Sequence, residues 1–178
     1  VLLAGYWAAF AIYPLPAEGF DFPSVGVPVN WAHHPLGFAA HWDKNTNLAH
    51  YADVWFLNLF PRVKPFLFNG GGYLTLNFVP SLVTMIFGLL SGGLLRSPMH
   101  AGPKLRLMFL AGLAGIAAGW ALELSGVCPA VKRIWTPSWT LLAGGWTVWI
   151  LAACFWVIDI KGWKGWTFPF VVVGMNSI

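Results

Sequence analysis

The sequence predicts an all-α fold, a multi-pass bundle of transmembrane helices, on two main observations. Hydrophobic residues make up 58% of the 178 residues and charged residues only 9%, whereas a soluble domain carries about 25% charged residues. The stretch Leu74–Leu95 has no formal charge, and as a helix it is roughly 33 Å long, enough to cross a hydrocarbon core of about 30 Å. We therefore expect a single membrane domain over residues 1–178, with about five helical segments.

The first and last of these segments are expected to be truncated helices. Residues 1–15 are apolar and aromatic and end at the two prolines of YPLP, which stop a helix. Because so short a stretch does not cross a bilayer comfortably, it is interpreted as the second half of a transmembrane helix. Residues 166–178 are expected to begin another apolar helix, which the sequence leaves incomplete.

A long connection, residues 16–72, holds most of the ionisable groups. Proline, glycine and asparagine argue against regular structure in its first half. In its second half, apolar residues recur at helical spacing over 47–60, and Asn47 or Thr46 is a suitable N-cap. We expect a short amphipathic helix here, lying at the membrane interface.

The central helix, residues 74–95, carries a stripe of polar and small side chains. Its members are three or four residues apart and so share one helical face; they are Asn77, Ser81, Thr84, Gly88 and Ser91. The favoured interpretation is a helix–helix packing seam, because Gly88 and Gly92 would let a neighbouring helix approach closely. The alternative is that the stripe lines a path for a substrate or cofactor, next to the backbone hydrogen bond that Pro80 removes.

Two further spanning helices are expected at residues 105–124 and 138–158, both rich in apolar residues. The first of them contains small residues at a spacing of four, which predicts a second packing seam. These residues are Ala111, Gly115 and Gly119.

The distribution of lysine and arginine predicts the orientation of the bundle. Five basic residues lie on the short loops 96–106 and 159–166, against Lys132 and Arg133 on the opposite short loop. The excess of positive charge marks the cytoplasmic side, so the 16–72 connection is expected to face outward, to a periplasm or lumen. Basic residues are not clustered with interleaved aromatics, so no nucleic-acid partner is expected.

Histidines and aspartates of the 16–72 connection are the first candidates for chemistry. They are ordinary polar loop residues in the favoured interpretation, and a proton-transferring His–Asp pair is the alternative. Metal-binding spacings such as HExxH are missing from the sequence, so no metal site is predicted. The pairs considered are His33–His34, His41-x-Asp43 and His50-x-x-Asp53.

Three ordered stretches of the chain carry a family resemblance. They are NLAHYADVWFLNLFPR (Asn47 to Arg62), LNFVPSLVTMIFGLLSGGLLRS (Leu76 to Ser97), and KRIWTPSWTLLAGGW (Lys132 to Trp146) followed by WVIDIKGWKGWTFPFVVVGMNSI (Trp156 to Ile178). Together, in their order and spacing, they resemble the heparan-α-glucosaminide N-acetyltransferase family and its bacterial homologues, over nearly the whole chain.

The resemblance implies a multi-pass acyltransferase that takes acetyl from cytoplasmic acetyl-CoA and transfers it to an amino sugar across the membrane. It implies a bacterial inner membrane, with the 16–72 connection in the periplasm. The family's catalytic histidine lies in an earlier outward-facing segment, which none of the histidines here matches, so no catalytic residue is predicted.

Topology and resemblance together suggest where donor and acceptor would bind. They would meet in a cavity between helices, which we expect to be lined by Asn77, Ser81, Thr84, Asn176 and Ser177. The phosphates of acetyl-CoA would be attracted by Arg96, Lys104 and Arg106. On the acceptor side we expect Asp53, Lys132, Arg133 and Trp135.

Two functions of other classes remain open at this stage. The chain could be a non-enzymatic accessory subunit of a larger membrane complex, packed against lipids and partner helices through its aromatic, seam-rich surface. A transporter is the weaker alternative, suggested by Pro80 and the polar stripe.

Overall fold

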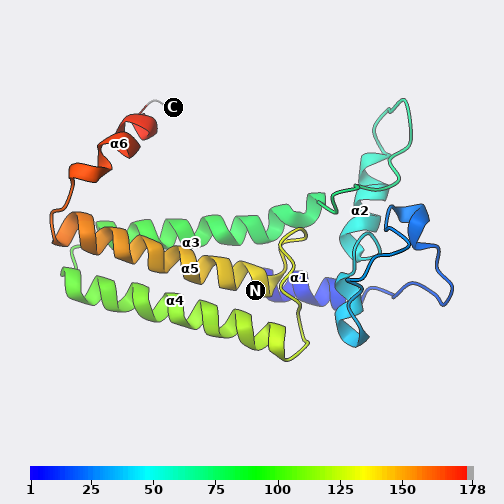
Figure 1. Ribbon diagram of the computed structural model, residues 1–178, viewed down its shortest axis with the longest axis horizontal. Coiled ribbons are helices and arrows are strands. Elements are labelled where there is room, and N and C mark those ends of the chain that lie inside the picture. Colours follow the sequence, from blue (N-terminus) through cyan, green and yellow to red (C-terminus); the bar gives the residue numbers. More distant parts are fainter. Residues whose placement is uncertain (176–178) are drawn as a thin grey trace.

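Helices make up the regular structure of residues 1–175, which are the residues that the computed structural model describes, and this range contains no strand (Figure 1). The α-helices are α1 (Leu2–Ala11), α2 (Leu48–Leu57), α3 (Phe78–Arg96), α4 (Ala101–Leu124), α5 (Pro137–Phe155) and α6 (Phe168–Met175). Short 3₁₀ turns lie at Phe22–Val25, Gly37–Trp42, Thr75–Asn77 and Gly165–Thr167, and a π-helical turn, Trp156–Ile160, extends α5.

The long helices α3, α4 and α5 run side by side along the long axis of the molecule (Figure 1). With their adjoining turns they span Thr75–Arg96, Ala101–Leu124 and Pro137–Ile160, and all three are long and apolar enough to cross a membrane. The expected all-helical architecture is therefore confirmed for three spans. The flanking helices α1 and α6 have only 10 and 8 residues in the described range.

Helix boundaries differ from the expected ones by a few residues. The first helix ends at Ala11 rather than at residue 15, and the helix expected at 47–60 is α2, which ends at Leu57. The helix expected from residue 105 begins at Ala101, because Pro103 falls in its first turn, where a missing N–H costs nothing. The predicted N-cap of α2 is confirmed, since the Asn47 side chain accepts a hydrogen bond from the backbone N–H of His50.

Glycines bring α4 and α5 into direct backbone contact. A Cβ atom added to Gly145 of α5 would lie 2.6 Å from the carbonyl oxygen of Gly112, and one on Gly119 would lie 2.8 Å from the carbonyl oxygen of Ser138. The seam predicted in α4 is confirmed at Gly115 and Gly119. Gly112 takes the place expected for Ala111.

Helix α3 packs more loosely. A Cβ atom at Gly88 or Gly92 would meet no atom within 4 Å, so the close helix approach predicted at these two glycines does not form within the described residues. The glycine seam of this bundle belongs to α4 and α5.

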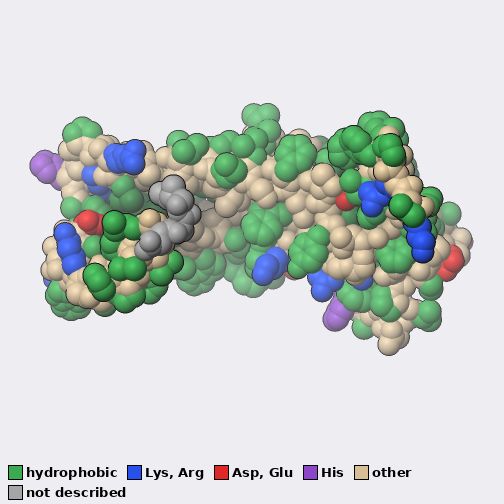
Figure 2. Space-filling model, turned by 90° about the horizontal axis from the view of Figure 1, so that it is seen from above, with side chains coloured by type: hydrophobic (Ala, Val, Ile, Leu, Met, Phe, Trp, Pro, Cys, Tyr) green, Lys and Arg blue, Asp and Glu red, His purple; other side chains and the backbone are tan. Residues whose placement is uncertain are grey.

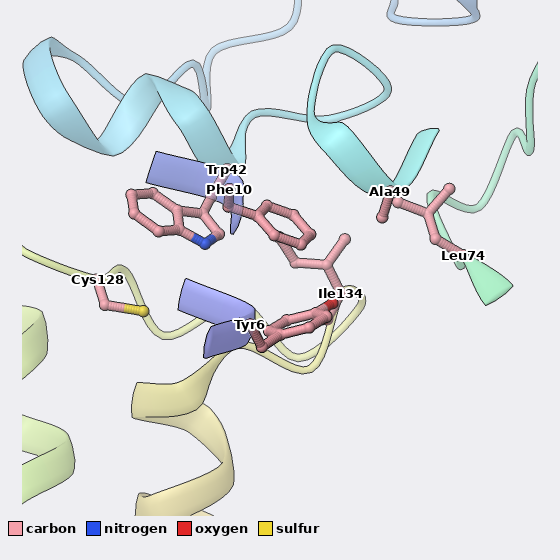
Figure 3. Close-up of a cluster of buried hydrophobic side chains, with 7 residues drawn as sticks. All are labelled: Tyr6, Phe10, Trp42, Ala49, Leu74, Cys128 and Ile134. Carbon is pink, nitrogen blue, oxygen red and sulfur yellow. The ribbon is translucent and has the colours of Figure 1, made fainter. Parts of the chain in front are cut away.

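One end of the bundle is covered by α1, α2 and the irregular segments around them (Figure 1). We call this the loop end. A buried cluster lies beneath it, in which the rings of Phe10 and Trp42 stack 6.3 Å apart and the Tyr6 hydroxyl donates a hydrogen bond to the Ile134 carbonyl (Figure 3). Because these residues come from α1, from the 16–72 connection and from the loop between α4 and α5, the cluster joins all three.

Candidate functional site

A pocket of about 380 Å³ lies at the loop end, between the 16–72 connection and the loop that joins α4 to α5. We call it the loop-end pocket. Aromatic, acidic and basic side chains meet in it, and those used below are Trp31, Trp42, Asp43, Lys44, Lys132 and Arg133. Neither loop forms the pocket alone.

Three cationic side chains border the pocket. The Lys44 ammonium lies 4.8 Å from the centre of the Trp31 ring, a cation–π distance. Arg133 donates a hydrogen bond from Nη1 to the Gly71 carbonyl at 2.8 Å, which ties the two loops together. Gly72, with φ of +73°, lets the backbone pass close to the side chains of Lys44 and Arg133. The result is a positively charged rim around an aromatic wall.

The carboxylate of Asp43 is the acidic group of the pocket, and it is 6% exposed. Its Oδ2 lies 2.5 Å from Nδ1 of His34, and its Oδ1 accepts a hydrogen bond from the backbone N–H of Lys44 at 2.6 Å. This His34–Asp43 pair joins residues that the sequence did not pair. A histidine oriented by a buried carboxylate is an arrangement suited to proton transfer.

Buried asparagines hold this part of the chain in place. The Asn45 side chain donates to the carbonyls of Val25 and Asn69, and that of Asn47 donates to the carbonyl of Asp43. Backbone carbonyls removed from water need such donors. The polar run around Asp43 is therefore an ordered wall of the pocket.

Two tryptophans of the pocket wall carry buried indole N–H groups. Within residues 1–175, neither Nε1 of Trp31 nor Nε1 of Trp42 has a hydrogen-bond partner. An unsatisfied buried donor costs about 1–3 kcal/mol. A bound molecule with acceptor oxygens would relieve this cost, either directly or after a small rearrangement of the pocket around that molecule.

His50 and Asp53 lie in α2 and do not line the pocket. Both oxygens of Asp53 accept from the backbone N–H of Thr75, at 3.1 and 3.0 Å, so this carboxylate anchors the entry to α3. Burial lowers the pKa of His50, and the nearby charge of Asp53 opposes that shift. Among the described residues no group of three or more His, Cys, Asp or Glu side chains is arranged to hold a metal ion. The predicted acceptor-side residue Asp53 is not part of the loop-end pocket.

The predicted polar stripe of α3 fastens that helix to the neighbouring loop. Asn77 donates to the Arg133 carbonyl at 2.7 Å, and Nε1 of Trp135 donates to Oγ1 of Thr84 at 3.4 Å. Ser81 is half-buried and borders neither the loop-end pocket nor the larger groove described below. Thr84 borders a small hollow of about 80 Å³ between α3 and α5, and a shared donor and acceptor cavity at these side chains stays a prediction. Trp135 contacts α3 rather than the loop-end pocket.

Basic side chains expected at the opposite end have unequal roles. Lys104 is 7% exposed and donates from Nζ to the carbonyl of Leu95 at 2.7 Å, so it caps the end of α3. Arg96 and Arg106 are exposed and available. Uncharged, largely apolar surface separates the basic groups of the two ends (Figure 2). Asn176 and Ser177 lie outside the described residues.

The fold and this site define a helical protein with three potential membrane spans and a charged, tryptophan-walled pocket at one end. No protein-family model, curated protein or solved structure matches the chain. Sequence reasoning found Lys132 and Arg133 and considered Asp43 beside His41, but it missed the pairing of Asp43 with His34, as well as Lys44 and the two tryptophans. The dense polar run DKNTN at 43–47, which directly follows Trp42, was the available signal.

Proposed function

We propose that this chain is part of a bacterial inner-membrane acyltransferase, which binds a polar acceptor in the loop-end pocket and uses acetyl-CoA as donor. The observation that carries the proposal is the joining of cationic, acidic and aromatic side chains in one pocket at the end of a membrane-type bundle. The resemblance described above supplies the reaction class and an amino sugar as acceptor.

The chemistry of the pocket is suited to a sugar. Tryptophan faces offer flat apolar area, while Lys44, Lys132 and Arg133 are donors for hydroxyl or acidic groups. Asp43, held by His34, is an acceptor for a cationic amine. In this proposal Arg96 and Arg106 attract the phosphates of the donor at the far end of the bundle.

The test is acetyl transfer from radiolabelled acetyl-CoA to glucosamine by the purified protein in lipid nanodiscs. Changing Lys132→Gln or Asp43→Asn should raise KM for the acceptor by about tenfold, the effect of losing one charged contact. Lys64→Gln is the matched control, because Lys64 is an exposed loop lysine outside the pocket. A folded protein that transfers no acetyl, and whose pocket variants bind glucosamine as the original does, contradicts the proposal.

A second candidate is an accessory subunit of a larger membrane complex, and α6 favours it. This helix extends away from the bundle (Figure 1), and Phe168 and Phe170 are 71% and 68% exposed. Helices that pack on a partner would leave such a surface in the isolated chain. The measurement is the particle mass in mild detergent: a fixed mass above that of the chain, with one identified partner and without acetyl transfer, supports this role.

A further inference from the structure

A second hollow lies within the membrane-spanning part of the bundle. This groove, of about 510 Å³, runs between α3 and α4 with α5 as its floor. Its walls are leucines and small residues, with Ser91 as the polar member, and they include Leu94, Leu107, Ala111, Ala114 and Gly144. It lies beside the glycine seam that joins α4 to α5. Helix α3 is tied to the bundle by hydrogen bonds of Asn77 and Trp135 at the loop end and of Lys104 at the opposite end.

The groove opens close to the basic end of the bundle. Leu94 lies two residues before Arg96, and Leu107 directly follows Arg106. From Leu107 to Gly115, α4 rises about 12 Å, which is close to the depth of one leaflet, about half of a 30 Å hydrocarbon core. The groove therefore extends from a charged mouth toward the middle of the bundle.

A buried charge lies on α4 one turn from the groove, at its basic end. Lys104 lies one turn before Leu107 and Met108 on the same face of α4, and its Nζ is 6.0 Å from the centre of the Phe155 ring. An ammonium group has three donors, of which the Leu95 carbonyl accepts one. Among residues 1–175, this end carries Arg96, Arg106, Lys161 and Lys164, against the carboxylate of Asp159. Such a mouth attracts a phosphate.

We propose that the groove binds one acyl chain of an anionic phospholipid, with the lipid phosphate at Lys104, Arg96 and Arg106. The volume lies within the roughly 300–1,000 Å³ typical of ligand pockets. Basic pockets between transmembrane helices are a recurrent way of binding anionic headgroups. This inference does not require acyl transfer, but it uses Arg96 and Arg106, which the proposed function assigns to the phosphates of acetyl-CoA. Lipid retention is therefore measured without acetyl-CoA, so that the two proposals can fail separately.

The experiment is native mass spectrometry of the purified chain released from nanodiscs made of equal amounts of phosphatidylglycerol and phosphatidylcholine. We expect one retained phosphatidylglycerol. Ala114→Phe fills the groove and should lower the retained lipid by about tenfold. Ala117→Phe is the matched control, because Ala117 is an exposed alanine of the same helix outside the groove. Ala111→Leu, a smaller change of the groove wall, gives a second variant should Ala114→Phe not fold.

The headgroup is tested separately with the double variant Arg96→Gln and Arg106→Gln, which leaves the Lys104 hydrogen bond intact. It should keep a bound lipid but lose the preference for phosphatidylglycerol over phosphatidylcholine. Equal retention of both lipids by the unchanged chain overturns the proposal. Unchanged lipid retention by the Ala114→Phe variant also overturns it. A dimer of the unchanged chain that Ala114→Phe separates into monomers would overturn it too, because a second copy of the chain would then occupy the groove.

Discussion

At the scale of single residues, the notable feature is a polar core beneath an irregular segment. Asn45, Asn47, His50 and Asp53 are each at most 3% exposed, although they lie in or beside a long connection. Regular structure would satisfy backbone groups by itself, and an irregular segment needs side chains to do this. The asparagines and Asp53 supply those partners, which is why this connection is ordered enough to form a pocket.

We predict that Asn47→Ala destabilises the loop end by about 1–3 kcal/mol. The substitution removes the N-cap of α2, and it leaves the carbonyl of Asp43 without its hydrogen-bond donor. Asn47→Asp keeps the capping oxygen and should lose less. Thermal unfolding in detergent, followed by near-UV circular dichroism, measures both. Asn30→Ala, at an exposed position, is the control, and an equal loss from all three changes would argue against the capping role.

His50 should make stability depend on pH. Because burial lowers its pKa in the folded protein, the unfolded chain binds protons more readily below its ordinary pKa of about 6.5. Stability should therefore be complete above that pH and fall as the pH is lowered through it. His50→Gln should flatten the fall in melting temperature between about pH 7.5 and 5.5. A pH slope that His50→Gln leaves unchanged would assign the titration to another group.

At the scale of elements, glycines have different roles in α3 and in the seam between α4 and α5. Gly145→Ala should destabilise the protein by about 1–3 kcal/mol, because the new Cβ meets the Gly112 carbonyl and Ile116. Gly88→Ala has open space and should be neutral or stabilising by about 0.5–1 kcal/mol, as in any helix interior. The free energies of unfolding of the two variants are compared in mixed micelles that contain increasing amounts of a denaturing detergent. Similar losses would mean that α3 also packs tightly, against a partner outside this chain.

At the scale of the whole molecule, the two charged ends of the bundle lie on opposite sides of an apolar middle (Figure 2). The loop end contains Lys132 and Arg133, and the other end contains Arg96, Lys161 and Lys164. A bundle of this kind has one orientation in a membrane, set by the excess of positive charge.

We predict opposite labelling of the two ends in intact bacterial cells. A membrane-impermeant maleimide should label Lys132→Cys in intact cells and Lys161→Cys only after permeabilisation. The unchanged chain is the control, because Cys128 is buried and Cys154 lies in the spanning part of α5. Labelling of both positions from outside would contradict a membrane-spanning arrangement, and the opposite pattern would reverse the orientation.

Local signals in the sequence by themselves determined the helical class, the three long apolar helices, an N-cap at Asn47 or Thr46 and the small-residue seam at Gly115 and Gly119. These depend on composition and on periods of three and four residues, which are properties of a single helix. Which glycine faces which helix was decided only by packing, so Gly88 and Gly145 could not be told apart in advance. The loop-end pocket, with its His34–Asp43 pair, was likewise decided only by tertiary structure. Its walls come from two loops far apart in sequence, and contacts between irregular segments leave no periodic pattern to read.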